Sequence, residues 1–302
     1  MVSKFGKLWT IALGDQVAVI AQKGATLVSY QKAGLDIIAP FDPNLDRSPA
    51  FNGAILAPWP NRIEGGKYTF AGQIHQLPIN EPELGNALHG LVYAKMFDFQ
   101  VMEPERVVLT LEQPGQVGYP WTLLYDVMYK LTPIGLKTVI RVTNRSDAHA
   151  PFGIGWHPWL TPNGDLDDSF LYMKAQNHLK NNPNLIPIAQ EPTRYPYNFN
   201  KKTSLINIDL DDGFTGFERG IDQRAKAFFT RTDNRQVEVW MDLSYRSFQI
   251  CSADHLNGLK RFALAVEPMS CPANAFNTKD DLIVLEPGEK RTFKCGIHVL
   301  PH

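Results

Sequence analysis

A histidine and a glutamate occupy equivalent places in two short segments of the sequence. His157 closes the segment 152–157, in which large apolar residues alternate with glycine, and Glu267 closes the segment 262–267, in which they alternate with alanine. Because successive side chains of a strand point to opposite faces, each segment predicts one large apolar face and one nearly bare face that ends in an ionisable group. A bare face leaves room for a ligand. We therefore interpret His157 and Glu267 as a candidate acid and base beside a cavity.

Proline follows both residues, as Pro158 and Pro268. Proline pushes the residue before it toward extended backbone and removes one hydrogen-bond donor from the ladder. We therefore expect both His157 and Glu267 to lie at strand ends. With one of these groups as acid and the other as base, we expect a bell-shaped pH profile, with the acidic limb from Glu267 and the basic limb from His157.

Other motifs carry polar groups that suit a sugar. Asn61-Arg62 offers an amide and the fixed donor fork of a guanidinium, His89 precedes a glycine, and Asp211-Asp212 pairs two carboxylates. Taken singly, each is as readily a surface loop, a structural histidine or a turn.

Two tryptophans, Trp156 and Trp159, flank His157. An aromatic face suits the C–H face of a pyranose, although core packing is the common alternative for tryptophan.

The elements that must position these groups are strands. A period of two dominates the sequence, and tight turn signals at residues 71–72, 132–135 and 233–235 join the segments as hairpins. We predict an all-β fold, a large antiparallel β-sandwich with little helix, built as a single domain over residues 1–302. The Asn- and Pro-rich stretch 160–203 is expected to form long loops on that scaffold. The clearest strand segments are residues 16–30, 107–112, 123–131, 136–142, 236–243 and 291–299.

Bulk composition excludes several classes of protein. The 302 residues carry 30 Lys and Arg against 31 Asp and Glu, so no basic field is present to hold nucleic acid. No apolar run is long enough to span a membrane, and a cytoplasmic protein is expected. The three cysteines are an odd number without a C-x-x-C pair, which argues against disulfides and a zinc site.

Five motifs, taken in order along nearly the whole chain, resemble those of the aldose 1-epimerase (galactose mutarotase) family. The resemblance implies a galactose mutarotase-like supersandwich and an enzyme of carbohydrate metabolism that interconverts the α and β anomers of a free aldose. It implies Glu267 as general base on the C1 hydroxyl and His157 as general acid on the ring oxygen. It also implies no cofactor, no metal, a small-molecule sugar as substrate, and a monomer or homodimer. The motifs are Asn61-Arg62-Ile63, Leu88-His89-Gly90, His157-Pro158, Leu210-Asp211 and Glu267-Pro268.

By the same resemblance, Arg62, His89 and Asp211 fall at substrate-binding positions, and Asn61 orients the site. If the register slips by one residue, Asp212 takes the place of Asp211. Asn61, Arg62, His89, Asp211 and Tyr245 form the expected substrate-binding set.

The chain departs from the galactose-specific branch of the family at one motif. Tyr245-Arg246-Ser247 stands where that branch carries Gln-Pro-Gly, which leaves the substrate open. A phosphorylated or sulfonated sugar is one alternative, with Arg246, Lys260 and Arg261 as candidate cations. A non-catalytic carbohydrate-binding protein and a metal-dependent lyase or hydrolase that uses both histidines as ligands are the others.

Overall fold

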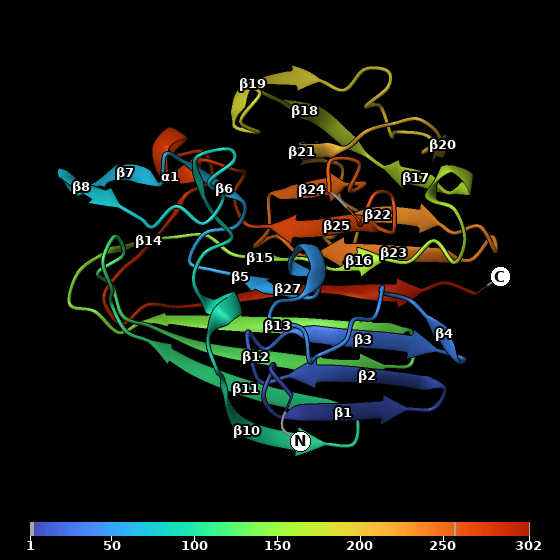
Figure 1. Ribbon diagram of the computed structural model, residues 1–302, viewed down its shortest axis with the longest axis horizontal. Helices are drawn as coiled ribbons and strands as arrows, with labels where there is room; N and C mark the ends of the chain where they lie inside the picture. The colour runs from blue at the N-terminus through green and yellow to red at the C-terminus, as the bar shows by residue number, and fades with distance from the viewer. Residues whose placement is uncertain (1–2, 257, 302) are drawn as a thin grey trace.

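Two large antiparallel sheets dominate the computed structural model, which describes residues 3–256 and 258–301 (Figure 1). The larger sheet has nine strands, in the order β10 (Asp98–Glu103), β11 (Arg106–Gln113), β12 (Leu123–Thr132), β13 (Gly135–Asn144), β27 (Lys290–Val299), β23 (Gln236–Met241), β22 (Ala225–Thr230), β17 (Phe170–Met173) and β20 (Thr203–Ser204). The eight-stranded sheet runs β19 (Pro187–Pro192), β18 (Ala175–Asn181), β21 (Asp211–Phe217), β24 (Ser247–Cys251), β25 (Leu264–Met269), β15 (Gly155–Trp156) and β5 (Ile55–Leu56), and β16 (Trp159–Leu160) also pairs with β25.

Smaller sheets complete the scaffold. A four-stranded sheet comprises β1 (Leu8–Leu13), β2 (Gln16–Ala21), β3 (Leu27–Lys32) and β4 (Leu35–Asp36), and β1 packs against β11 and β12 (Figure 1). Three strand pairs are β14 (Ala150–Phe152) with β26 (Ile283–Leu285), β6 (Arg62–Glu64) with β9 (Asn86–Leu88), and β7 (Lys67–Phe70) with β8 (Gln73–Gln76). Helix within the described residues is limited to α1 (Ala275–Thr278) and three 3-10 turns, Pro49–Phe51, Val92–Ala94 and Leu166–Asp168.

The alternating sequence pattern explains the large sheet. In β12 every second side chain is buried along the whole strand, as the period of two predicts. The predicted hairpins are confirmed, since β7 pairs with β8, β12 with β13, and β22 with β23. The all-β sandwich with little helix is therefore the observed fold.

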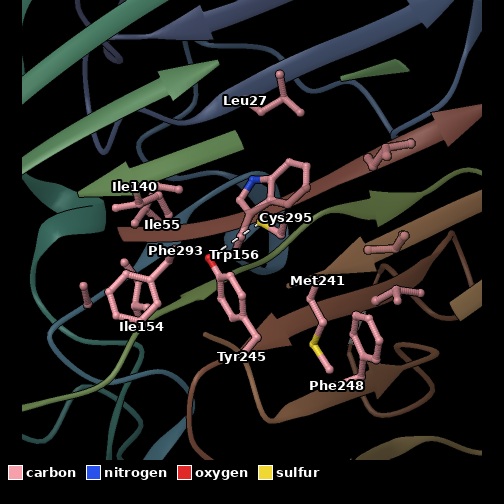
Figure 2. Close-up of a cluster of buried hydrophobic side chains, with 14 of the residues drawn as sticks. Leu27, Ile55, Ile140, Ile154, Trp156, Met241, Tyr245, Phe248, Phe293 and Cys295 are labelled. Carbon is pink, nitrogen blue, oxygen red and sulfur yellow. Dashed lines mark hydrogen bonds between the residues drawn. The ribbon is translucent and has the colours of Figure 1, made fainter. Parts of the chain in front are cut away.

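The hydrophobic core joins all three principal sheets. Leu27 of β3, Ile140 of β13, Trp156 of β15 and Phe248 of β24 belong to one continuous cluster of buried residues (Figure 2). β24 and β25 are buried along their entire lengths, so both faces of these strands are covered. One face packs on the core and the other supports the candidate site.

One expectation was wrong: the stretch 160–203 is not simply a set of loops. It contributes β17 and β18, and β19 forms the outer edge of the eight-stranded sheet. Five of the six residues of β19 are exposed. Its sequence therefore lacks the alternation of apolar and polar residues from which a strand is predicted.

Candidate active site

A cavity of about 550 Å³ gathers the polar residues singled out in the sequence. Phe51, Trp159, Cys251 and His255 also line it. The cavity brings together six of the seven expected site residues from distant parts of the chain: Asn61, Arg62, His89, His157, Asp211 and Glu267.

His157 and Glu267 occupy different positions relative to their strands. His157 follows the last residue of β15, as expected, but Glu267 lies inside β25, which runs on to Met269. The strand continues past Pro268 because hydrogen bonds hold it on either side. The N–H groups of Val266 and Ser270 donate to the carbonyls of Pro158 and Ile154, so Pro268 omits only the one donor between them, opposite Trp156.

The glycine face of the segment 152–157 is not the floor of the cavity. A Cβ atom on Gly153 would lie 2.5 Å from the Cys271 sulfur and 2.8 Å from Pro60, and a Cβ on Gly155 would lie 3.0 Å from Pro60. The glycines therefore allow the ring of Pro60, which directly precedes the Asn61-Arg62 motif, to pack against this segment. The expected room for a ligand begins only at His157.

His157 and Glu267 form a buried pair. The His157 Nε2 and Glu267 Oε1 atoms are 3.4 Å apart, with exposed side-chain fractions of 6% and 2%. Burial lowers the pKa of the His157 imidazole to about 3, and burial together with the Asp211 carboxylate raises the pKa of Glu267 well above 4.5. Both shifts favour the uncharged forms of the two side chains, in which the pair carries one proton.

Arg62 is held by carboxylates on two sides. Its Nε and Nη2 atoms donate to Glu81 Oε2 and Oε1, each at 2.9 Å, and its Nη1 lies 3.4 Å from Asp211 Oδ2. Burial alone would lower the pKa of Arg62, but Asp211 and Glu81 reverse that effect and raise it. The guanidinium is thus a permanent, oriented cation at the wall of the cavity.

The structure decides which aspartate faces the cavity. Asp211 contacts Arg62 and accepts a hydrogen bond from Gln249 Nε2 at 2.7 Å. Asp212 points to the opposite face of β21, where its Oδ1 lies 2.8 Å from His178 Nε2. Asp211, and not Asp212, belongs to the site.

Asn61 and His89 brace each other through two contacts. The Asn61 N–H donates to His89 Nδ1 at 3.2 Å, and the His89 N–H donates to the Asn61 carbonyl at 2.9 Å. Both residues have positive φ angles, 52° and 62°. Because Nδ1 accepts a hydrogen bond, the neutral His89 ring carries its proton on Nε2. Burial, His157 and Arg62 lower the pKa of His89 well below 6.5, which keeps the ring neutral.

The two tryptophans beside His157 have separate places. Trp159 lines the cavity, with its ring 5.6 Å from the His157 ring in a stacked arrangement. Trp156 lies fully buried in the core (Figure 2). Only Trp159 is therefore placed to face a sugar.

Tyr245 is the one expected binding residue that the structure does not bring to this cavity. It is fully buried in the core, where its ring is 5.9 Å from that of Phe293 and its hydroxyl oxygen accepts a hydrogen bond from the Cys295 thiol at 3.6 Å (Figure 2). The expectation of a substrate contact for Tyr245 is corrected accordingly. The backbone turns at Asp242–Tyr245 before β24 begins, and the turn directs the large ring inward.

The candidate cations for a charged sugar lie elsewhere or are engaged. Arg246 borders a different cavity and lies 3.9 Å from Asp281. Arg261 donates to Asp254 at 3.0 Å and to two backbone carbonyls. Lys260 is exposed and does not line the 550 Å³ cavity.

One group of side chains in the described part of the chain has metal-ligand geometry. It consists of Asp211, Cys251 and His255, whose ligand atoms lie within 4.8 Å of one another. The group includes neither His89 nor His157, the two ligands that the metal-dependent alternative would use. Burial and the Asp211 charge raise the pKa of Cys251 well above 9.0, so the thiol is protonated at neutral pH.

The sequence did not point to Glu81, Gln249 or Phe51. Glu81 lies in a polar connection between strands, Phe51 ends a 3-10 turn, and Gln249 becomes significant only through its hydrogen bond to Asp211. Register between β21 and β24 would have been the one signal, because it places Asp211 opposite Cys251, two residues from Gln249.

Comparison with known proteins identifies the family. A sequence model of the aldose 1-epimerase family matches residues 7–298, and the chain therefore belongs to the aldose 1-epimerase family. The chain is also 34% identical to the uncharacterized protein YihR of Escherichia coli K12 over 303 residues, which cover 97% of this chain and 93% of YihR.

Solved structures show the same fold. The GalM/aldose epimerase homologue of C. elegans matches with a TM-score of 0.85 and 19% identity, over 97% of this chain and 98% of that one. A galactose 1-epimerase of Lactobacillus acidophilus matches with a TM-score of 0.77 and 20% identity, over 96% and 93%. The predicted galactose mutarotase-like architecture is confirmed. In the part of the chain that the structure covers, no helix is both long and apolar enough to cross a membrane.

Proposed function

We propose that this protein is an aldose 1-epimerase that interconverts the α and β anomers of a free hexose by general acid and base catalysis. The observation that carries the proposal is the buried contact of 3.4 Å between His157 and Glu267 at a cavity that Arg62, His89 and Asp211 also line. Opening a hemiacetal requires one proton to leave the C1 hydroxyl and one to reach the ring oxygen. Two adjacent groups that share a proton can supply both transfers.

The proton count supports this mechanism in both directions. Glu267 as carboxylate takes the C1 hydroxyl proton while protonated His157 delivers one to the ring oxygen. The ring opens, and the C1–C2 bond rotates. For closure, His157 takes the proton back and Glu267 returns one to the C1 oxygen. The pair therefore carries a single proton at the start and at the end, and no proton has to enter the site.

Three neighbouring groups would act during ring opening. The substrate hydroxyl would supply a hydrogen bond to Glu267 Oε2, a buried atom that has no partner among the described residues. A hydrogen bond to that oxygen favours the charged carboxylate and so shifts the shared proton to His157. Arg62 and the Nε2–H of His89 are donors that would stabilise negative charge developing on substrate oxygens.

The experiment that tests the proposal is polarimetry of freshly dissolved α-D-glucose, α-D-galactose and glucose 6-phosphate, with and without the protein. We expect acceleration of at least one sugar, unchanged after exhaustive chelation of metals. Glu267→Gln keeps the shape of the side chain but removes the base, so kcat should fall about 100-fold or more.

Binding of the same sugars, measured by calorimetry, separates the enzyme from a carbohydrate-binding module. The enzyme predicts that Glu267→Gln retains most of the affinity while turnover is lost. Sugar binding by the wild-type protein without any acceleration of mutarotation would favour the binding module and refute the enzyme. Acceleration of the phosphorylated sugar alone would identify a charged substrate, with exposed Arg47 at the cavity as the cation to test.

A further inference from the structure

A carboxylate, a thiol and an imidazole converge at one wall of the cavity that holds His157 and Glu267. They belong to Asp211, Cys251 and His255. Asp211 and Cys251 are cross-strand partners of β21 and β24, so their side chains point to the same face of the sheet. His255 is exposed and joins them from the turn that follows β24. The sheet therefore fixes two of the three groups, and the third can adjust its rotamer.

The spacing of the three ligand atoms is close to that around a tetrahedral zinc ion. All three lie within 4.8 Å of one another, and His255 Nε2 is 3.7 Å from Asp211 Oδ2. Zinc bonds of about 2.0 Å to oxygen and nitrogen and about 2.3 Å to sulfur place tetrahedral ligands about 3.3–3.6 Å apart. Small rotations of the side chains, that of His255 above all, would close the set.

Neighbouring side chains orient the Asp211 carboxylate for this role. Gln249 Nε2 donates to Oδ1 at 2.7 Å, and Oδ2 is the oxygen that faces His255. Arg62 is the competing cation. Its Nε and Nη2 atoms donate to Glu81 at 2.9 Å, whereas its two contacts to Asp211 Oδ2 are 3.4 Å and 3.5 Å. The contact with Asp211 is the weaker one, so Asp211 can turn to a metal ion while Glu81 still holds Arg62.

The chemistry of the three groups selects among metal ions. A thiolate and an imidazole favour Zn²⁺ and Co²⁺, whereas Mg²⁺ and Ca²⁺ require oxygen ligands. Three protein ligands leave the fourth tetrahedral position to a water molecule. As the bond between the metal and Cys251 Sγ forms, the thiol proton passes to the solvent.

A metal ion at this place would obstruct the candidate active site. It would draw Asp211 away from Arg62, whose guanidinium that carboxylate helps to orient. It would also occupy part of the cavity that a sugar has to enter to reach His157 and Glu267. Metal and sugar would therefore compete for the same space.

We infer that Asp211, Cys251 and His255 form an inhibitory Zn²⁺ site in the wall of the catalytic cavity. The inhibition rests on the proposed function, because it concerns regulation of the same site. Binding of the metal does not rest on it and can be measured without turnover.

Cobalt spectroscopy of the full-length protein, freed of metal by chelation and desalting, tests the site directly. Co²⁺ serves as the probe because a tetrahedral cobalt ion bound to a thiolate gives intense visible bands and a near-ultraviolet charge-transfer band. We expect both in the wild type, with one Co²⁺ bound and displaced by one Zn²⁺. The charge-transfer band should vanish in Cys251→Ser, and His255→Ala should weaken Co²⁺ binding at least about tenfold.

Matched controls remove the same chemical groups elsewhere. Cys271→Ala removes a buried thiol and His149→Ala an exposed imidazole, and neither residue lines the cavity. Both controls should keep the wild-type spectrum. Absence of the charge-transfer band in the wild type, or its persistence in Cys251→Ser, would overturn the inference.

Polarimetry with added Zn²⁺ or Mg²⁺ tests the inhibition, each variant being compared with its own metal-free rate. We expect Zn²⁺ to raise the apparent KM of the wild type and both controls, a chelator to reverse the effect, and Mg²⁺ to have none. Half-inhibition of Cys251→Ser and His255→Ala should require at least about tenfold more Zn²⁺. If the rates of the wild type and Cys251→Ser respond alike to Zn²⁺, the inhibitory role is overturned while the proposed function stands. If Co²⁺ binds as expected but no sugar is turned over, the metal site stands and the proposed function fails.

Discussion

The shared proton of His157 and Glu267 sets how activity should depend on pH. Only the state with one proton on the pair is active, so the acidic limb reports uptake of a second proton and the basic limb reports loss of the last one. With the pKa of His157 lowered to about 3 and that of Glu267 raised, the acidic limb belongs to His157 and the basic limb to Glu267. This order reverses the sequence-based expectation, which took each group at its ordinary pKa.

Initial rates of mutarotation between pH 3 and pH 10, corrected for the uncatalysed reaction, measure this profile. We expect the acidic limb to lie well below pH 6.5, the ordinary pKa of histidine, and the basic limb to lie well above pH 4.5, the ordinary pKa of glutamate. An acidic limb centred near 6.5 would contradict the lowered pKa of His157.

The stability of the protein should respond to the same carboxyl group. A raised pKa in the folded state means that Glu267 holds its proton more tightly when folded. Its contribution to stability is full below 4.5 and is lost as the pH rises through the folded value. Glu267→Gln should therefore gain Tm relative to the wild type as the pH increases from 4 to 8, which differential scanning fluorimetry can follow. An equal Tm difference at both pH values would refute the raised pKa.

Asp211 and Asp212 provide a matched pair of substitutions on adjacent residues. Asp211→Asn removes the charge that helps to orient the Arg62 guanidinium. The substitution should lower kcat/KM by roughly 10- to 100-fold, chiefly through KM. Asp212→Asn changes a contact with His178 on the other face of β21 and should change kcat/KM by less than about twofold. Equal losses in the two variants would show that general weakening of β21, and not contact with the site, is responsible.

At the scale of elements, the glycines of the segment 152–157 allow Pro60, the residue before the Asn61-Arg62 motif, to pack closely against that segment. Gly153→Ala would place its Cβ 2.5 Å from the Cys271 sulfur and 2.8 Å from Pro60. We expect a loss of about 1–3 kcal/mol in unfolding free energy and a raised KM, because Pro60 must shift and Asn61 follows it. Gly155→Ala meets Pro60 only at 3.0 Å and is expected to cost less. Urea unfolding and steady-state kinetics of both variants measure the difference.

The alternating pattern predicted these strands well, but it could not predict which other residues line the cavity. The period of two identified the apolar face of Trp156 and the position of His157 at the end of β15. The same pattern could not show whether the glycine face leaves room for a ligand or lets another part of the chain pack closely, because glycine permits both. Nor could it choose between Asp211 and Asp212, because that choice depends on the register of β21 against β24.

Tyr245 shows a different limit. Its position was expected from likeness to a family motif, yet the motif is missing here and a large aromatic residue stands in its place. In the folded chain the ring occupies the core beside Phe293 and Cys295. A residue that stands where relatives carry a functional motif can therefore serve packing of the core and need not contact the substrate.

At the scale of the whole molecule, the core runs without interruption between the sheets. The cluster that begins at Trp9 in β1 extends to Ile297 in β27 and includes residues of both large sheets. We therefore predict that residues 1–302 unfold as a single domain, in one transition with the same midpoint by tryptophan fluorescence and by far-ultraviolet circular dichroism. Two separated midpoints would show that the sheets unfold independently.

The brace between Asn61 and His89 determines which changes at position 61 the protein can tolerate. The group that sets the imidazole tautomer is a main-chain amide, which every residue except proline possesses. Replacement of Asn61 by another side chain would leave that amide in the sequence and act instead through the φ angle of 52°, which asparagine and glycine adopt more easily than other residues. The backbone at position 61 thus determines that the neutral His89 ring carries its proton on Nε2. A substitution that changes only the side chain at position 61 leaves this tautomer unchanged.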